Sequence, residues 1–375
     1  MNTGKHNIPL VTPHMSDEGY EQKFIKEAFD ANWIAPLGAN VTGFEDEICT
    51  YIGAKAAAAL VSGTSAMHLA IRSEGIGNGD IVLCQSLTFS ASVNPVIYEN
   101  ATPVFIDSES DTWNMSPEAL ERAFVKYPKA KAVILVHLYG TPAKLDEITA
   151  ICKKRGAVLL EDAAEALGST YGNEKCGTFG DFGILSFNGN KIITTSGGGM
   201  LLCNLPDADE RIAKVRFWAA QSRDPARYYQ HSELGYNYRM SNILAGIGRG
   251  QMLVLNDRLA KKRHIFDYYS QKLSGLDGLE MMPRISGQNC WLSCIQLNGK
   301  ISSTNVMDAL LAEGIESRPV WKPMHLQPLY INCDYIDNGG VSERLFTGGV
   351  CLPSDTKLAD EELDRVCSVI RGLWE

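Results

Sequence analysis

Between Ala56 and Cys203 the chain alternates short apolar runs with amphipathic stretches, and this alternation constrains the fold more than any other feature. Seven runs are predicted to be strands: Ala57–Val61, Ile81–Cys84, Pro103–Ile106, Ala132–His137, Ala157–Glu161, Ile184–Phe187 and Met200–Cys203. Helices are predicted between several of them, at Ser65–Gly75, Ser116–Lys126 and Lys144–Gly156. Near-continuous apolar strands with helical crossovers are typical of a parallel sheet that helices cover on both faces. The sequence therefore predicts a large α/β domain with a mainly parallel, seven-stranded sheet.

Helical segments flank this region on both sides. Before it, Ser16–Asn32 is predicted as a helix capped by Ser16, and Phe44, Ile48 and Tyr51 mark a second helix. After it, a basic helix is predicted at Arg258–Leu273. Two strands are predicted at Cys290–Leu297 and Val350–Leu352, and two further helices at Thr304–Gly314 and Asp360–Gly372. We therefore divide the chain into a large domain with the N-terminal helices, residues 1–257, and a smaller C-terminal α/β domain, residues 258–375.

The composition limits what the protein can bind. Its 375 residues, 45% of them hydrophobic, are enough for a sizeable core. A net charge of −9 argues against a nucleic-acid surface and favours a small-molecule ligand. The ten cysteines lack the paired spacing of a zinc site, and scattered reduced thiols favour a cytoplasmic protein. We expect neither a signal peptide at Met1–Pro13 nor a membrane span, because both need a longer apolar run.

The carboxyl ends of the predicted strands are where a ligand is expected, because open parallel α/β sheets bind ligands at that edge. Five loops meet there, after Val61, Cys84, His137, Glu161 and Phe187. In the first of these loops, Gly63, Thr64 and Ser65 open a helix, and the backbone N–H groups of a helix start suit a phosphate. An ordinary Ser/Thr helix cap explains the same residues.

One lysine stands out at this edge. Lys191 lies in a polar turn between the apolar run that ends at Phe187 and the three glycines Gly197–Gly199. A lysine that forms a Schiff base with pyridoxal phosphate (PLP) needs an unprotonated amine, and a partly desolvated pocket favours that form. Lys191 suits this role, although a solvated loop lysine is the alternative for any single lysine.

Asp162 supplies a second element of such a site, because it follows a predicted buried strand. A carboxylate there can pair with the protonated nitrogen of a pyridine ring. A divalent metal held by Glu161, Asp162 and Glu165 is the alternative, but no histidine is near them in the sequence. Phe89 could stack on the ring or belong to the core.

Together these motifs resemble the DegT/DnrJ/EryC/StrS sugar aminotransferases, which are fold type I PLP enzymes that act on nucleotide-linked keto-sugars. The resemblance covers essentially the whole chain, through Pro36–Gly38, Gly63–Ser65, Asp162, Lys191 and Arg318–Lys322. Within the group, the chain is most similar to the bacillosamine-pathway enzymes. The stretches that carry this finer likeness are Asn32–Gly38, Ser186–Met200 and Gly235–Asn242.

The resemblance implies roles for matching positions. Lys191 would be the catalytic lysine, Asp162 would pair with the pyridine nitrogen and Phe89 would stack on the ring. The other cofactor-binding residues would be Gly63, Thr64, Ser65, Glu165, Ser186, Asn188 and Asn237. Asn237 is expected to reach the phosphate of the second subunit, which implies a homodimer with shared active sites. The substrate-binding candidates are Trp33, Arg239, Lys322 and His325, although a packed or helix-capping histidine explains His325 equally well.

The implied reaction moves an amino group from L-glutamate to C4 of a nucleotide-linked 4-keto-6-deoxy sugar, with pyridoxamine phosphate (PMP) as intermediate. The expected substrate is UDP-2-acetamido-2,6-dideoxy-xylo-hexos-4-ulose. Alternatives are another NDP-keto-sugar, of the GDP-perosamine or 3-keto type, a dehydratase or amino-acid transaminase of the same fold, and a non-catalytic regulator that binds PLP or a sugar nucleotide. The presence of lysine at position 191 argues against the dehydratases, in which histidine replaces it.

Overall fold

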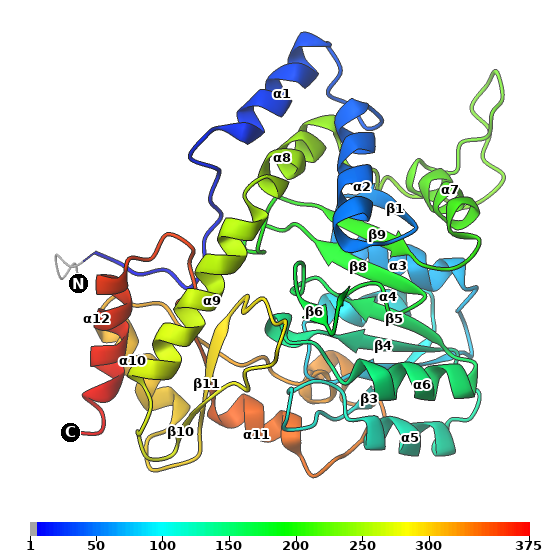
Figure 1. Ribbon diagram of the computed structural model, residues 1–375. Helices are drawn as coiled ribbons and strands as arrows, with labels where there is room; N and C mark the ends of the chain where they lie inside the picture. Colours follow the sequence, from blue (N-terminus) through cyan, green and yellow to red (C-terminus); the bar gives the residue numbers. More distant parts are fainter. Residues whose placement is uncertain (1–5) are drawn as a thin grey trace.

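The computed structural model describes residues 6–375 and contains a large and a small sheet, with helices around both (Figure 1). The large sheet has eight strands in the order β1-β9-β8-β5-β4-β2-β3-β13. Their bounds are β1 Ala56–Leu60, β2 Ile81–Gln85, β3 Thr102–Ile106, β4 Ala132–Val136, β5 Val158–Asp162, β8 Phe182–Ser186, β9 Gly199–Cys203 and β13 Tyr335–Ile336. Only β9 runs antiparallel to its neighbours. The sheet is therefore mainly parallel, as predicted.

All seven predicted strands are present, with ends that differ by one or two residues. The eighth strand, β13, is a correction to the seven-stranded prediction. It comes from the C-terminal part of the chain and pairs with β3, with Tyr335 opposite Phe105 and Ile336 opposite Ile106. Two residues are too short for a readable strand pattern, and their pairing depends on tertiary contacts.

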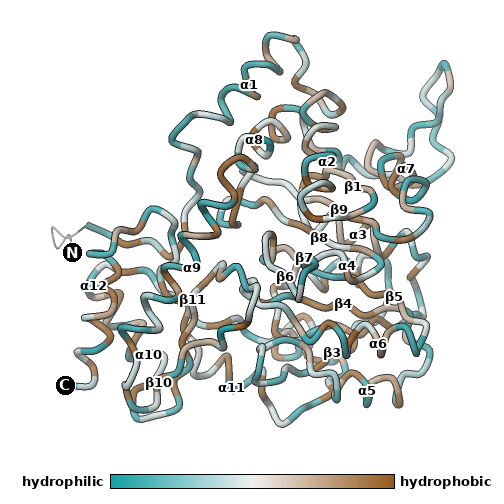
Figure 2. The backbone as a smooth tube through the Cα atoms, viewed as in Figure 1, coloured by the Kyte–Doolittle hydropathy of each residue, from teal (hydrophilic) through white to brown (hydrophobic). Residues whose placement is uncertain are grey.

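Helices cover both faces of the large sheet because successive strand residues point to opposite sides. On β4, Val133 and Leu135 belong to one buried cluster, whereas Ala132 and Ile134 belong to another. The apolar colouring of the central strands in Figure 2 follows this double burial. The helices of the large domain are α1 Tyr20–Asp30, α2 Ala39–Ile52, α3 Gly63–Ser73, α4 Asn94–Tyr98, α5 Pro117–Lys126, α6 Leu145–Arg155, α7 Ala208–Ala219 and α8 Asn242–Met252.

The first helix begins later than predicted. Gly19, with a φ of 71°, precedes the first residue Tyr20, and Ser16 lies before the helix, where its hydroxyl accepts a hydrogen bond of 2.9 Å from the Tyr20 N–H. Of the apolar residues that recur on one face of this helix, Tyr20, Phe24, Ile25, Ala28 and Phe29, only Ala28 is buried, and Phe29 is 60% exposed. The helix therefore offers apolar surface that its own chain leaves uncovered.

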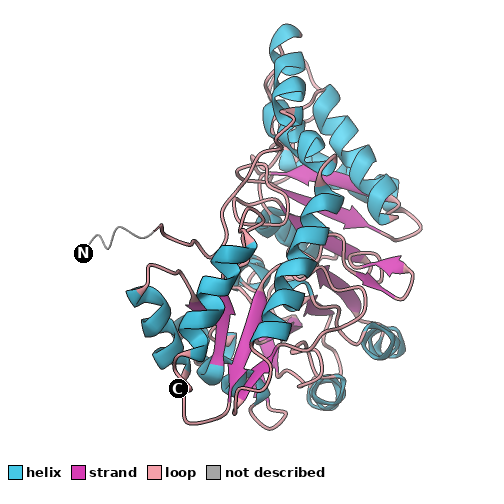
Figure 3. Cartoon of the chain, turned by 60° about the vertical axis from the view of Figure 1, so that its left-hand side comes forward, coloured by secondary structure: helices cyan, strands magenta, loops and turns pink. Residues whose placement is uncertain are grey.

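The small domain has its own sheet, ordered β10-β11-β14-β12, and its own core (Figure 3). Its elements are α9 Leu255–Lys272, β10 Leu279–Met281, β11 Ser293–Leu297, α10 Ser303–Ala312, β12 Arg318–Pro319, α11 Val341–Gly348, β14 Gly349–Leu352 and α12 Asp360–Arg371. We retain a boundary near residue 257 as a proposal. Two segments cross it, because Ile8 forms a bridge with Ile315 and β13 joins the large sheet. Within residues 6–375, no helix is both long and apolar enough to cross a membrane.

Candidate active site

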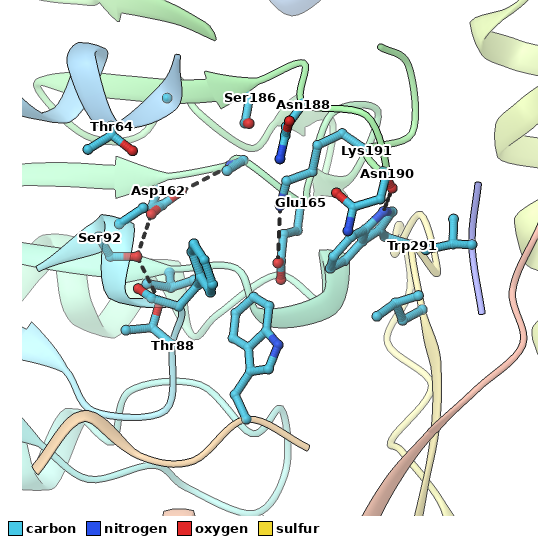
Figure 4. Close-up of a pocket in the computed structure, with 18 of the residues that line it drawn as sticks. Thr64, Thr88, Ser92, Asp162, Glu165, Ser186, Asn188, Asn190, Lys191 and Trp291 are labelled. Atoms are coloured by element: carbon cyan, nitrogen blue, oxygen red, sulfur yellow. Dashed lines mark hydrogen bonds and ion pairs between the residues drawn. The ribbon is translucent and has the colours of Figure 1, made fainter. Parts of the chain in front are cut away.

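A cavity of about 770 Å³ lies where the carboxyl ends of β1, β4, β5 and β8 face the small domain (Figure 4). Nine of the residues predicted for the site line it: Gly63, Thr64, Phe89, Asp162, Glu165, Ser186, Asn188, Lys191 and Lys322. These residues come from five separate segments of the chain. The edge of the sheet at which a ligand was expected is therefore the edge at which the cavity forms.

One end of the cavity is the amino terminus of α3. Ser62 caps this helix by accepting a hydrogen bond from the Ser65 N–H (3.0 Å), so the N–H groups of Gly63 and Thr64 lack acceptors within the helix. Gly63 also lies close to the end of β8, since a Cβ there would be 3.2 Å from the Ser186 Cβ. Free N–H groups beside a serine hydroxyl form a site for a phosphate.

Asp162, the last residue of β5, is buried and held in place. Its Oδ2 accepts a hydrogen bond of 2.6 Å from Ser92, and its Oδ1 accepts one of 3.1 Å from the Ala164 N–H. Ser92 in turn bonds the Thr88 hydroxyl at 2.8 Å. The sequence prediction missed Ser92, which lies in a short 3₁₀ turn after Phe89. This network fixes the direction in which the Asp162 carboxylate faces the cavity.

The neighbouring Glu161 faces away from the cavity, as strand alternation requires. Its Oε2 lies 2.8 Å from His137 Nε2, and it accepts hydrogen bonds from the N–H groups of Gly177, Phe179 and Gly180. His137 is therefore distant from these carboxylates in the sequence but adjacent to Glu161 in the fold. Among the described residues no cluster of three or more His, Cys, Asp or Glu is placed to hold a metal ion.

The long connection between β8 and β9 carries Lys191. Ile192 and Ile193 are buried directly after it, and the N–H of Thr195 donates to the Phe187 carbonyl at 2.9 Å. A Cβ at Gly199 would lie 2.2 Å from the carbonyl carbon of Ser62. The glycine therefore lets β9 pass directly behind the start of α3, which brings the lysine loop and the phosphate end of the cavity together.

The Lys191 amine lies between a carboxylate and an aromatic ring. Its Nζ is 3.3 Å from Glu165 Oε1 and 4.3 Å from the centre of the Trp291 ring. Trp291 is fixed by a hydrogen bond of 2.9 Å from its Nε1 to the Asn190 carbonyl. The sequence prediction missed Trp291, because nothing in the pattern places this small-domain residue beside the lysine loop.

The small domain closes the cavity with Trp321, Arg318 and Lys322. The Trp321 ring lies 5.6 Å from the Phe89 ring, and Phe89 is 58% exposed, so Phe89 borders the cavity and is not a core residue. Arg318 pairs with Glu316 at 2.7 Å. The resemblance covers Arg318–Lys322 but predicts a role only for Lys322, so the position of Arg318 at the cavity is a finding of the structure.

Five predicted site residues lie outside the cavity of this subunit: Ser65, Trp33, Asn237, Arg239 and His325. Ser65 turns toward Ser62, with 2.8 Å between their hydroxyls, and Trp33 and Asn237 are exposed. Arg239 is buried, with Nη1 3.7 Å from Glu45 Oε1. His325 stacks on Tyr335 at 3.7 Å and bonds the Ser86 hydroxyl at 2.7 Å, which is the packed alternative. The roles predicted for these residues stay predictions.

Comparison with known proteins supports the same family. The profile of the DegT/DnrJ/EryC1/StrS aminotransferase family matches residues 16–371. EpsN of Bacillus subtilis, named as a pyridoxal phosphate-dependent aminotransferase, is 51% identical over 98% of this chain and 96% of its own length. GDP-perosamine synthase of Caulobacter vibrioides is 38% identical over 97% of each chain. Spr1654 of Streptococcus pneumoniae, named as a sugar aminotransferase and solved in PLP and PMP forms, superposes with a TM-score of 0.90. It is 25–26% identical over 98% of this chain and 98–99% of its own.

The cavity fits PLP at both of its polar ends. The free N–H groups of Gly63 and Thr64, with the Ser186 hydroxyl, match the phosphate, and the buried Asp162 carboxylate matches a pyridine nitrogen. The amine of Lys191 lies in the same cavity. The chain therefore belongs to the DegT/DnrJ/EryC1/StrS aminotransferase family and is a PLP-dependent enzyme of fold type I that acts on nucleotide sugars.

Proposed function

We propose that the enzyme transfers the amino group of L-glutamate to C4 of a nucleotide-linked 4-keto-6-deoxy sugar. The observation that carries this proposal is the position of the Lys191 amine, in one cavity with the Asp162 carboxylate and the phosphate-binding start of α3. The proposed product is UDP-4-amino-4,6-dideoxy-N-acetylglucosamine, made from UDP-2-acetamido-2,6-dideoxy-xylo-hexos-4-ulose.

Each residue of the cavity has a part in this reaction. Bound PLP supplies an electron sink that stabilises negative charge on the carbon next to the transferred nitrogen. Asp162 keeps that sink effective by pairing with the ring nitrogen, and Ser92 holds Asp162 in position. The Lys191 Nζ takes a proton from the carbon of the amino donor and later gives one to C4 of the sugar. Gly63, Thr64 and Ser186 anchor the phosphate, so that Lys191 acts from one face.

Both proposed substrates are anionic, and the small domain offers cations to them. Arg318 and Lys322 border the cavity on the side of Trp321, and guanidinium and ammonium groups suit carboxylates and diphosphates. The preference for a UDP-linked N-acetyl sugar rests on the likeness of three stretches to the bacillosamine-pathway enzymes, namely Asn32–Gly38, Ser186–Met200 and Gly235–Asn242. Turnover of UDP-, GDP- and dTDP-linked 4-keto sugars, with product stereochemistry read by NMR, tests it. A GDP-linked sugar that turns over fastest contradicts it.

A second candidate is an aminotransferase of the GDP-perosamine type. It is favoured by the GDP-perosamine synthase of Caulobacter vibrioides, at 38% identity over nearly the whole chain. The same substrate panel separates the two candidates, because they differ in both the nucleotide and the substituent at C2.

We also propose a homodimer with shared active sites. Phe29, Trp33, Ile34 and Leu37, which we call the N-terminal apolar patch, are each at least half exposed. A patch of this kind on a protein surface marks an interaction site. Asn237 lies near the end of the segment between α7 and α8, where it forms a β-bridge with Ala220. This segment projects from the body of the molecule (Figure 1). A second copy that covers the patch would let Asn237 reach the cavity of its partner.

Hybrid dimers test this arrangement. A Lys191→Ala chain and an Asn237→Ala chain are co-refolded at equal amounts, and each is expected to be nearly inactive alone. If Asn237 serves the partner subunit, a hybrid keeps one intact site, and the mixture recovers about a quarter of the wild-type activity. If Asn237 serves its own subunit, no site is intact and no activity returns.

The ten cysteines, all unpaired in the structure, support a cytoplasmic location for this dimer.

A further inference from the structure

Glu165 is the one carboxylate that touches the Lys191 amine among the described residues, and both side chains are shielded from water. Glu165 is 4% exposed, the Lys191 side chain is 13% exposed, and Glu165 Oε1 lies 3.3 Å from Nζ (Figure 4). The face of Trp291 on the ammonium offers no atom that can accept a proton. A proton that leaves Nζ inside this cavity therefore has Glu165 as its nearest acceptor.

The backbone around Glu165 holds its carboxylate in this position. Oε2 accepts a hydrogen bond of 2.7 Å from the Tyr139 N–H, and the Glu165 carbonyl accepts one of 2.8 Å from Asn289. Tyr139 has a φ of 53°, which is uncommon for a residue with a side chain, and such strain gathers at functional sites. The left-handed turn at Tyr139 aims its N–H at one carboxylate oxygen and leaves the other for Lys191.

The groups around Glu165 decide how readily it binds a proton. Burial raises the pKa of the Glu165 carboxyl to about 7, and the nearby Asp162 raises it too, whereas Lys191 and the Tyr139 N–H lower it. Tyr139 and Cys294 are the other titratable side chains that face it, and burial raises the pKa of both well above their ordinary values, so they stay neutral. Near neutral pH, Glu165 can thus both receive and return a proton.

We propose that Glu165 is a catalytic residue that takes a proton from the Lys191 ammonium, so that the freed amine can attack the aldehyde of PLP. The N–H bond at Nζ breaks, an O–H bond forms at Oε1, and the pair passes from ammonium and carboxylate to amine and carboxylic acid. The return of that proton recharges Lys191. This inference rests on the role of Lys191 in the proposed function, but it is independent of the sugar substrate.

The rate at which PLP combines with the cofactor-free full-length protein tests the proposal, because no substrate is involved. The expected result is that Glu165→Gln loads PLP about a hundredfold more slowly than the wild type above neutral pH, a loss typical of a missing proton acceptor. Wild-type loading slows as the pH falls through about 7, and the Gln variant lacks this dependence. Loading by Glu165→Gln that is as fast as the wild type, or faster, overturns the proposal, since it means that Glu165 only stabilises the ammonium.

Two further proteins keep the test decisive. Glu74→Gln is the matched control, because burial also raises the pKa of Glu74, which pairs with Arg211 far from the cavity. It should load PLP at the wild-type rate. Glu165→Asp keeps the test valid if the Gln variant misfolds, because it retains a carboxylate. It should load PLP more slowly than the wild type and keep the dependence of the loading rate on pH. Infrared spectra add a direct readout, namely a carboxylic acid C=O band that grows below about pH 7 and is absent from Glu165→Gln. A carboxylate band alone across this range contradicts the proposal.

Discussion

Ser92 donates a hydrogen bond of 2.6 Å to Asp162, which joins the turn after β2 to the carboxyl end of β5. Ser92→Ala removes a hydrogen bond to a carboxylate while adding no bulk. We expect PLP affinity to fall about tenfold, because hydrogen bonds to charged groups contribute about 1.5–3 kcal/mol. Titration of the cofactor-free protein with PLP measures this. Ser90→Ala, outside the cavity in the same turn, is the control and should bind PLP normally. Equal affinities for the two variants would show that Asp162 does not need Ser92.

The charge of Asp162 is tested by Asp162→Asn, which keeps the shape of the side chain. We expect turnover to fall about tenfold to a hundredfold, because the amide cannot pair with a protonated pyridine nitrogen. Initial rates at saturating PLP measure the change. Rates within twofold of the wild type would remove Asp162 from the cofactor site.

Arg318 tests the cationic side of the cavity, where the anionic substrates are proposed to bind. Arg318→Gln should raise KM for the anionic substrates about threefold to tenfold with little change in kcat, a modest effect because its side chain is 64% exposed. Arg284→Gln is the control, because it removes another exposed, ion-paired arginine of the small domain. A fall in kcat at unchanged KM would place Arg318 in the chemistry and not in binding.

Glu165 should also make stability depend on pH. Burial raises its pKa from 4.5 to about 7, so the folded protein binds this proton more tightly than the unfolded chain does. That contribution is full below about pH 4.5 and is lost as the pH rises through about 7. The free energy of unfolding of the cofactor-free wild type should therefore fall by about 3 kcal/mol relative to Glu165→Gln across this range. Urea titrations at a series of pH values measure the difference, and parallel curves for the two proteins would contradict it.

The sequence predicted the elements of the fold that have a regular hydrophobic pattern. Seven strands and most helices follow from apolar runs and capping residues, and the motifs at Gly63, Asp162 and Lys191 all face the cavity. β13 could not be predicted, because a strand of two residues is too short to show an alternating hydrophobic pattern. Trp291 and Ser92 could not be placed because their contacts join segments that are distant in the sequence.

Two contacts of Glu161 and Glu165 could not be predicted from the sequence either, one because of the strand order and one because of an unusual backbone conformation. His137 meets Glu161 only because β4 and β5 are neighbours in the sheet, an order that the sequence does not state. The hydrogen bond from the Tyr139 N–H to Glu165 depends on a left-handed backbone conformation at Tyr139, which a tyrosine seldom adopts. Residue preferences predict against this geometry, so the partner of the Lys191 amine emerged only from the structure.

The visible absorption of the PLP-loaded protein through one full transfer cycle tests the role of Lys191 most directly. We predict that L-glutamate bleaches the absorption of bound PLP and that the UDP-linked 4-keto sugar restores it. Lys191→Ala should show neither change while remaining folded. Absorption that L-glutamate and other amino donors leave unchanged in the wild type, or steady-state transfer by Lys191→Ala, would contradict these predictions.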